Sequence, residues 1–141
     1  MQFDPNNPII QLCVEGMRLE GEGKKAEASE LFQRAWEESS NDFEKFTSAH
    51  YVARHQQSVE DKLKWDEIAL ISALQINDES MKASYPSLYL NIAKGYEDLQ
   101  DFDQAIKNYH LAQSFIHFLP DDGYGQLVKN GITNGITRVT V

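Results

Sequence analysis

The sequence predicts an all-α protein built from stacked helical hairpins. A comb of large and small residues occurs twice, with successive spacings of 4, 3, 9, 4 and 3 residues, and the second copy begins 77 residues after the first. The first copy is Leu12, Gly16, Leu19, Ala28, Phe32 and Ala35, and the second is Tyr89, Ala93, Tyr96, Ala105, Tyr109 and Ala112. Apolar residues also recur at a helical period of about 3.6 along most of the chain. Such self-similarity indicates hairpins that bury their apolar faces against one another.

Four helices are expected in the first half of the chain. A lead-in from Phe3 to Asn7 precedes helix one, which runs from about Pro8 to Glu20 with proline in its first turn. Gly21-Glu22-Gly23 ends helix one, and helix two runs from about Lys24 to Glu38. Helix three is expected from about Asp42 to Gln57. Helix four is expected from about Glu60 to Gln75, after a capping turn that begins at Ser58.

The second half is expected to hold three more helices. A longer connection from Asn77 to Tyr85 leads to a hairpin within residues 86–119. A break at Leu119-Pro120 follows, and Asp121 or Asp122 caps a last helix at 122–139. In that helix Gly131 and Gly135 are four residues apart, so they share a face and allow close packing against the sixth helix. Its polar outer face is supplied by Lys129, Asn130, Thr133, Asn134 and Arg138.

The comb resembles the tetratricopeptide repeat, a helix–turn–helix unit of about 34 residues. The match is best over residues 86–119, where Ala93, Tyr96 and Ala105 stand at the family's small and large positions. A first copy spans residues 9–42, and an irregular middle unit at 43–85 holds about nine residues more than a regular repeat. The resemblance implies a tetratricopeptide-like solenoid of three hairpins plus a C-terminal capping helix at 122–139. As a base rate, it also implies protein interaction.

Composition bounds the class of protein. The chain has 141 residues, is 41% hydrophobic and 25% charged, and is expected to form one domain over residues 1–141. No apolar run approaches the roughly 20 residues of a membrane helix. The segment from Met1 to Pro5 lacks the features of a signal peptide. A single cysteine, Cys13, is expected to be buried and unreactive, so a reducing cytoplasmic location is favoured.

The charge disfavours two classes of partner. The formal net charge is −9, and the acidic excess is spread along the whole chain. Proteins that bind nucleic acids usually carry a basic patch, and none is visible. An anionic membrane surface is disfavoured for the same reason. We therefore expect neither a nucleic-acid nor a membrane partner.

No motif for catalysis, a cofactor or a metal stands out. The Gly21-Glu22-Gly23-Lys24-Lys25 run lacks the spacing of a phosphate loop, and a helix stop explains it. His50 and His55 are five residues apart and do not share a helix face. His110 and His117, both expected on helix six, have no third ligand with them. The sequence therefore predicts a protein that is not an enzyme and has no cofactor or metal.

The family resemblance points to a ligand groove. In relatives that hold the acidic C-terminus of a chaperone, asparagine and basic residues on the first helix of each repeat grip carboxylates. Asn91 matches such an asparagine, and Lys94 lies one turn beyond it on the same face. In the middle unit, His50 and Arg54 are four residues apart on one face. At the equivalent places the first unit has Cys13, Val14 and Met17, which departs from the chaperone-binding pattern and gives the groove an apolar end.

The favoured function is therefore a non-catalytic protein- or peptide-binding module. His50, Arg54, Asn91 and Lys94 would line one concave surface and grip a carboxylate-bearing peptide. An alternative is an assembly protein that forms a homodimer or a fixed complex while its groove stays empty. A less favoured alternative is an enzyme or small-molecule binder that uses His50, Arg54 and Tyr85. In the simplest interpretation, Arg54 and Lys94 pair with nearby acids and bind nothing.

Overall fold

The structure, a computed structural model, describes residues 4–140. In that range it contains seven α-helices, two short 3-10 helices and no strand, which confirms the predicted all-α class. Phe3 of the expected lead-in, together with the rest of the segment before Asp4, lies outside the described residues, as does Val141. The chain divides into two compact units, Met1–Ile76 and Asn77–Val141. That the chain works as one domain stays a prediction.

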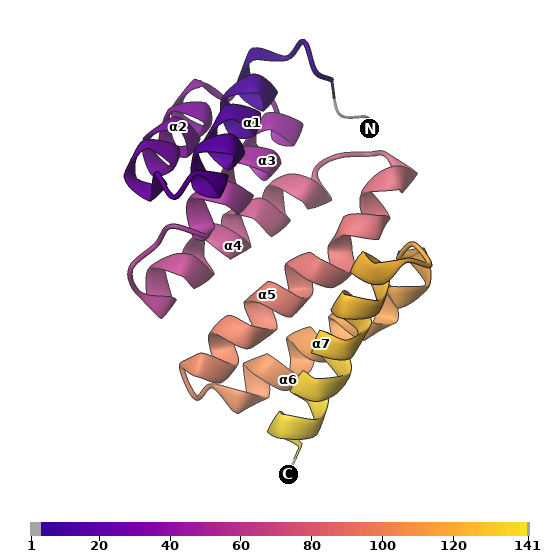
Figure 1. Cartoon of the computed structure of the whole chain (residues 1–141). Helices are drawn as coiled ribbons and strands as arrows, with labels where there is room; N and C mark the ends of the chain where they lie inside the picture. Colours follow the sequence, from indigo (N-terminus) through magenta and orange to yellow (C-terminus); the bar gives the residue numbers. More distant parts are fainter. Residues whose placement is uncertain (1–3, 141) are drawn as a thin grey trace. The chain divides into compact units, whose positions relative to one another are not determined.

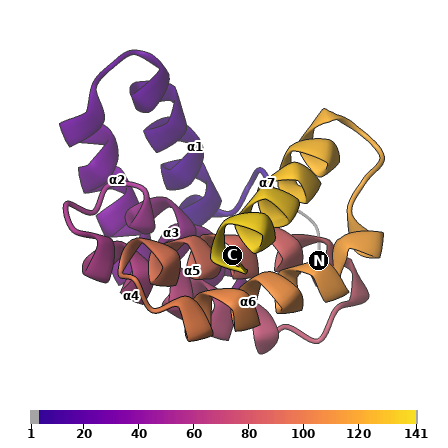
Figure 2. The same cartoon turned by 90° about the horizontal axis from the view of Figure 1, so that it is seen from below.

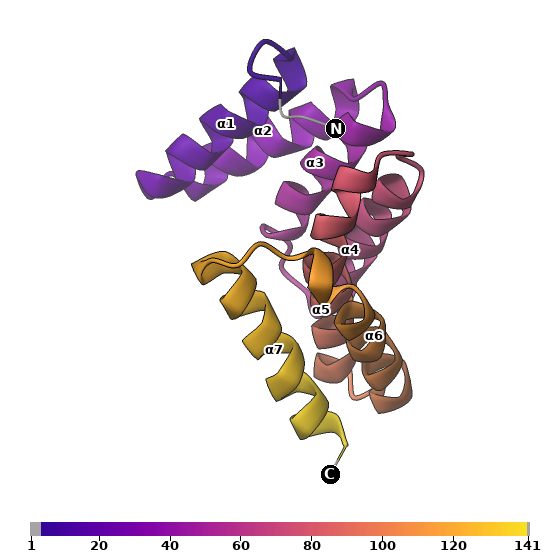
Figure 3. The same ribbon diagram turned by 90° about the vertical axis from the view of Figure 1, so that its right-hand side faces the viewer.

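The first unit consists of two helical hairpins. They are α1 (Pro8–Gly21) with α2 (Lys25–Glu38) and α3 (Asp42–Ala53) with α4 (Val59–Leu74). The helices of each hairpin lie side by side (Figure 1). Helix α3 also packs against both helices of the preceding hairpin (Figure 3). The second hairpin is therefore stacked on the first through its leading helix.

Side-chain caps fix where these helices begin. The Asn7 side chain accepts hydrogen bonds from the backbone N–H groups of Ile9 and Ile10, at 2.8 and 3.2 Å. Ser58 caps α4 by accepting from the Asp61 N–H at 3.1 Å, as its sequence predicts. Helix α3 ends at Ala53 rather than at the expected Gln57, because the N–H groups that follow it turn back to carbonyls only three residues earlier.

The first comb forms the core of the first unit. Ala28, Phe32 and Ala35 on α2 are fully buried. Phe32 fills the space left by Gly16 on α1, where an added Cβ would lie 2.4 Å from Phe32 Cε1. The Phe32 ring also stacks on Tyr51 of α3, with 4.9 Å between ring centroids. Gly16 therefore leaves room for the Phe32 ring, and the other side of this ring packs against α3.

The second unit consists of one hairpin and a last helix. Its elements are η1 (Glu79–Ser84), α5 (Tyr85–Asp98), α6 (Phe102–Ser114), η2 (Ile116–Phe118) and α7 (Gly123–Val139). Figure 2 shows α5 beside α6, and α7 packs against both of them. The expected connection from Asn77 to Tyr85 is largely the η1 turn, which packs on α5 and η2. His117 lies in η2 and not on helix six as expected, because α6 ends at Ser114.

The second comb forms the core of this unit. Ala93, Ala105 and Tyr109 are fully buried in one cluster. An added Cβ on Gly135 of α7 would lie 2.2 Å from two atoms of the Tyr109 ring, so Gly135 meets α6 as expected. Gly131 does not, since its nearest neighbour is Leu90 of α5, 3.0 Å from an added Cβ. Four residues advance a helix by about 40° beyond a full turn, so glycines on one face of α7 meet different helices.

None of the helices in residues 4–140 combines the length and apolar character needed to cross a bilayer.

Trp36 on α2 and Trp65 on α4 meet edge to face, with ring centroids 5.1 Å apart. Both are partly buried against the core of the first unit. Their role is packing between helices, as their apolar neighbours suggest.

Candidate functional site

The four residues predicted to form a ligand site fall in two different units. His50 lies on α3, and Arg54 is the first residue after the end of α3; both belong to the first unit. Asn91 and Lys94 lie on α5 in the second unit. Within each unit the pair is separated by about one helical turn, as expected. That the two pairs line one common surface stays a prediction.

Arg54 is held in place on two sides. Its Nη2 donates to Glu20 Oε1 at 2.8 Å, and Glu20 comes from the last turn of α1. Its guanidinium lies over the Tyr51 ring, 5.2 Å from the ring centroid. The second carboxylate oxygen of Glu20 lies 2.7 Å from His55 Nε2. Glu20 thus ties the residues after α3 to the end of α1, while 45% of the Arg54 side chain remains exposed.

A hollow of about 430 Å³ lies in front of Arg54. It is formed where the first turns of α2 meet the turn between α3 and α4. The residues that line it are Lys25, Ala26, Ser29, Arg54, His55, Gln56 and Gln57. Sequence reasoning found Arg54 but missed Lys25, Ser29 and the two glutamines, since no spacing rule links two turns that meet only in the folded chain. Lys25 belongs to the run that was interpreted as a helix stop.

The hollow has a cationic lining. It includes no acidic residue, and Lys25 forms no ion pair with another residue of the described chain. Arg54 gives Nη2 to Glu20, so its remaining N–H groups stay available. Gln56 donates its side-chain amide to the Val52 carbonyl at 3.1 Å, which holds the turn. Hydrogen-bond donors therefore outnumber acceptors here, and an anion is the ligand that such a set suits.

His50 is a neutral member of the predicted site near pH 7. Burial lowers the pKa of its imidazole, and the nearby positive charges of Arg54 and Lys62 lower it further. The ring meets Tyr51 edge to face, with 5.2 Å between centroids. His50 can therefore donate one hydrogen bond to a ligand, but it does not add a positive charge at neutral pH.

The second pair is differently placed. Lys94 forms an ion pair with Asp98 one turn further along α5. Asn91 is partly exposed, and its side chain makes no hydrogen bond with any described residue. The interpretation that the cations pair with nearby acids is thus correct for Lys94 with Asp98 and for Arg54 with Glu20. These pairs are partly or largely exposed, so a stronger ligand can exchange with them.

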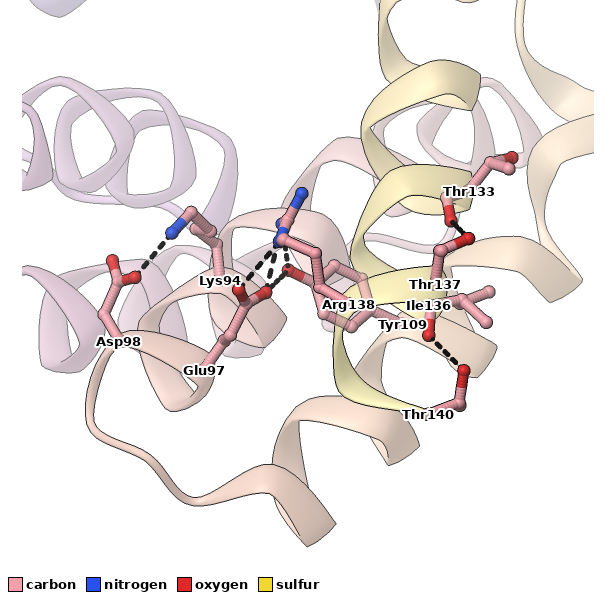
Figure 4. A network of polar contacts seen from close by, with 9 residues as sticks. All are labelled: Lys94, Glu97, Asp98, Tyr109, Thr133, Ile136, Thr137, Arg138 and Thr140. Carbon is pink, nitrogen blue, oxygen red and sulfur yellow. Dashed lines mark hydrogen bonds and ion pairs between the residues drawn. The ribbon is translucent and has the colours of Figure 1, made fainter.

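Glu97, the other acid near Lys94, is engaged elsewhere. Tyr109 donates its hydroxyl proton to Glu97 Oε1 at 2.6 Å, and Arg138 of α7 donates to both Glu97 oxygens, at 2.8 and 3.0 Å (Figure 4). The Arg138 hydrogen bond is the main cause of a lowered Glu97 pKa. Burial, followed by the Glu97 carboxylate, raises the Tyr109 pKa. Arg138 therefore closes α7 onto α5 and does not simply belong to the polar outer face expected for it.

Two residues expected in the groove are not on the surface. Cys13 is 1% exposed in the core of the first unit, where burial raises the pKa of its thiol to about 11. Of its expected companions, Val14 is exposed and Met17 packs against that core. Tyr85 is buried, with its ring edge-on to Phe115 at 5.2 Å between centroids. Cys13 and Tyr85 thus contribute to the packing of the helices, and neither is available on the surface for a ligand.

Neither a metal centre nor a known relative supplies a function. In the part of the chain that the structure describes, no three His, Cys, Asp or Glu side chains are grouped to hold a metal ion. Comparisons with protein-family models, curated proteins and solved structures gave no match. The packing of the hairpins and the surroundings of Arg54 are therefore the features that bear on function.

Proposed function

We propose that the chain is a tetratricopeptide-like solenoid that binds a protein or peptide without catalysis. Three hairpins, α1–α2, α3–α4 and α5–α6, would form the solenoid, and α7 would cap it. Two parallels support this assignment. In both combs the two alanines and the aromatic residue of the second helix are fully buried, and the large residues of the first helix are partly or fully buried. In each unit the next helix packs on both helices of that hairpin, as α3 does on α1 and α2 and α7 does on α5 and α6.

The observation that carries the binding function is the restrained Arg54 facing an open hollow. Glu20 and Tyr51 fix the guanidinium, so less side-chain freedom is lost when a ligand binds. In a chain of net charge −9, an exposed arginine in a cationic lining attracts a carboxylate locally. We propose a carboxylate-bearing peptide as the ligand, with His50, Asn91 and Lys94 as further contacts. Lys94 would then exchange Asp98 for the ligand.

The net charge bears on which partners we propose for the protein, and the Cys13 thiol bears on where we propose that it works. The acidic composition supports neither a nucleic-acid nor a membrane partner. Cys13 is a free buried cysteine, as is usual in a reducing compartment, so we propose that the protein works in the cytoplasm.

A second candidate function is assembly with copies of itself or with a fixed partner. Large apolar side chains are exposed on α4 and α7. On α4, Ile71 is 59% and Leu74 is 46% exposed, and on α7 Leu127 is 70% exposed. Exposed large apolar side chains can mark a surface that another chain covers. Sedimentation velocity at increasing concentration separates the two candidates, since a binding module that works alone stays monomeric.

Peptide selection tests the proposed function. A display library of random octapeptides with free C-termini is panned on the full chain, and selected peptides are measured by calorimetry. Arg54→Gln is expected to weaken the selected peptide by at least about tenfold. Arg34→Gln is the matched control, because it removes the same charge and an exposed ion pair, here with Glu38 on α2. Failure to select any peptide, or equal binding by both variants, would remove the proposal and leave assembly as the better candidate.

A further inference from the structure

We infer that the hollow in front of Arg54 is a site for a single carboxylate group, gripped by Lys25 and Arg54. The inference rests on the proposed peptide binding and deepens it, since it names the subsite and adds Lys25, Ser29 and Gln57 to it. The site lies wholly within the first unit, between α2 and the turn after α3.

The geometry supplies converging donors. Lys25 and Ser29 are four residues apart, so both side chains lie on the same face of α2. Arg54 and Gln57 face them from the turn that joins α3 to α4. The volume of about 430 Å³ falls within the range of pockets that take small ligands. An acidic side chain or a chain terminus can therefore enter and meet donors from two sides.

The local charge selects a monoanion. Lys25 forms no ion pair within residues 4–140, whereas the charge of Arg54 is offset by Glu20, 2.8 Å away. Lys25 and Arg54 carry two positive charges and Glu20 carries one negative charge, which leaves a net charge of about one positive for one carboxylate to neutralise. A phosphate dianion would leave an excess negative charge beside Glu20. The shared ligand chemistry is thus a carboxylate, whether it comes from a peptide or from a small organic acid.

The restraints on Arg54 argue for recognition and against a chance cluster. One guanidinium nitrogen is used by Glu20, and the Tyr51 ring covers one face of the group, so its remaining N–H groups are directed by the protein. Glu20 in turn holds His55 at 2.7 Å, which fixes the turn that lines the hollow. Lys25, by comparison, is exposed, and the flexible stem of a lysine side chain lets its ammonium group turn toward a bound anion.

Backbone amide NMR of the full chain provides the test. The probes are acetyl-Ala-Leu-Ala with a free carboxyl group, the same peptide as its amide, sodium acetate and inorganic phosphate. We expect the free-carboxyl peptide to shift the amide signals of residues 25–29 and 54–57, and the peptide amide to leave them unchanged. Lys25→Gln is expected to weaken the titration roughly three- to tenfold. Lys24→Gln is the matched control, because Lys24 is the neighbouring lysine, pairs with Glu22 and does not line the hollow.

The outcomes separate this inference from the proposed function. Equal binding by the two lysine variants, or tighter binding of phosphate than of acetate, would overturn the carboxylate site. If a library peptide binds through Arg54 while the signals of residues 25–29 stay fixed, the site is wrong and the proposed function stands. If acetate binds at the hollow as tightly as the peptide, the carboxylate site stands and a small organic acid replaces the peptide as its source.

Discussion

The contact between α7 and the α5–α6 hairpin depends on glycine at position 135. An alanine there would place its Cβ 2.2 Å from Cε1 and Cζ of Tyr109. The Tyr109 ring is fully buried, and its hydroxyl is held by Glu97 and Arg138. The ring cannot swing aside without losing these bonds, so α7 itself must move. We therefore expect Gly135→Ala to destabilise the second unit.

The magnitude follows from two opposing effects. Overpacking by one carbon in a buried contact costs about 1–3 kcal/mol. Alanine is favoured over glycine inside a helix by about 1 kcal/mol, which offsets part of the loss. The net change expected for Gly135→Ala is therefore a loss of up to about 2 kcal/mol. At Gly131 the nearest atom is Cδ2 of Leu90, 3.0 Å from an added Cβ, and a flexible leucine can shift by a few tenths of an ångström. Gly131→Ala is therefore expected to be close to neutral.

Urea unfolding followed by circular dichroism measures both variants. Gly21→Ala serves as a control, because nothing lies within 4 Å of a Cβ added at that helix end. We expect a lower unfolding midpoint for Gly135→Ala and little change for the other two. If Gly135→Ala is as stable as Gly131→Ala, the close approach of α7 to Tyr109 is wrong. The placement of the last helix would then need revision.

Four further variants test the remaining contacts. Ala93→Leu and Ala105→Leu are each expected to lose about 1–3 kcal/mol in urea unfolding, because both sites are fully buried where α5 meets α6. Burial raises the pKa of Glu44, but hydrogen bonds from Ser40, Asn7 and Asn41 outweigh it and lower the pKa below its ordinary value. Its stabilisation is therefore present above that value and is lost as the pH falls through the folded pKa, so Glu44→Gln is expected to be less stable at pH 7 and to respond less to acid. Removal of residues 124–141 uncovers the apolar cluster around Ala112 and is expected to cause aggregation in light scattering, and a monomer of unchanged stability would contradict a capping role.

The helices were predictable because their signals are local. Asn7 and Ser58 cap helices where the sequence places them, and the apolar period fixes which faces are buried. The end of α3 was not predictable in the same way. Ser58 marks where α4 begins, but nothing local says that the chain leaves α3 at Ala53. Glu20 holds Arg54 and His55 there, and it is more than thirty residues away in the sequence.

The candidate site was predictable only in part, for the same reason. Spacing along one helix identifies pairs such as His50 with Arg54, because a helix brings residues four apart to one face. It does not reveal Lys25, which meets Arg54 only through the stacking of hairpins. Spacing along one helix also does not show which acidic residue each cation pairs with. Lys94 pairs with Asp98, whereas Glu97 is bound by Arg138, which lies 41 residues further along the chain.

One of the differences between the two copies of the comb, Phe32 in the first and Tyr109 in the second, bears on how each unit packs against its next helix. Phe32 and Tyr109 are equivalent in the repeat, and both rings are fully buried. Phe32 has no polar group, and its contact with α3 is an aromatic stack on Tyr51. Tyr109 brings a hydroxyl into the same setting, where an unpaired hydroxyl would cost about 1–3 kcal/mol. Glu97 accepts its proton, and Arg138 of α7 then neutralises the Glu97 carboxylate. One added oxygen thus turns an apolar docking position into a polar one, which explains why α7 carries an arginine where it meets the hairpin.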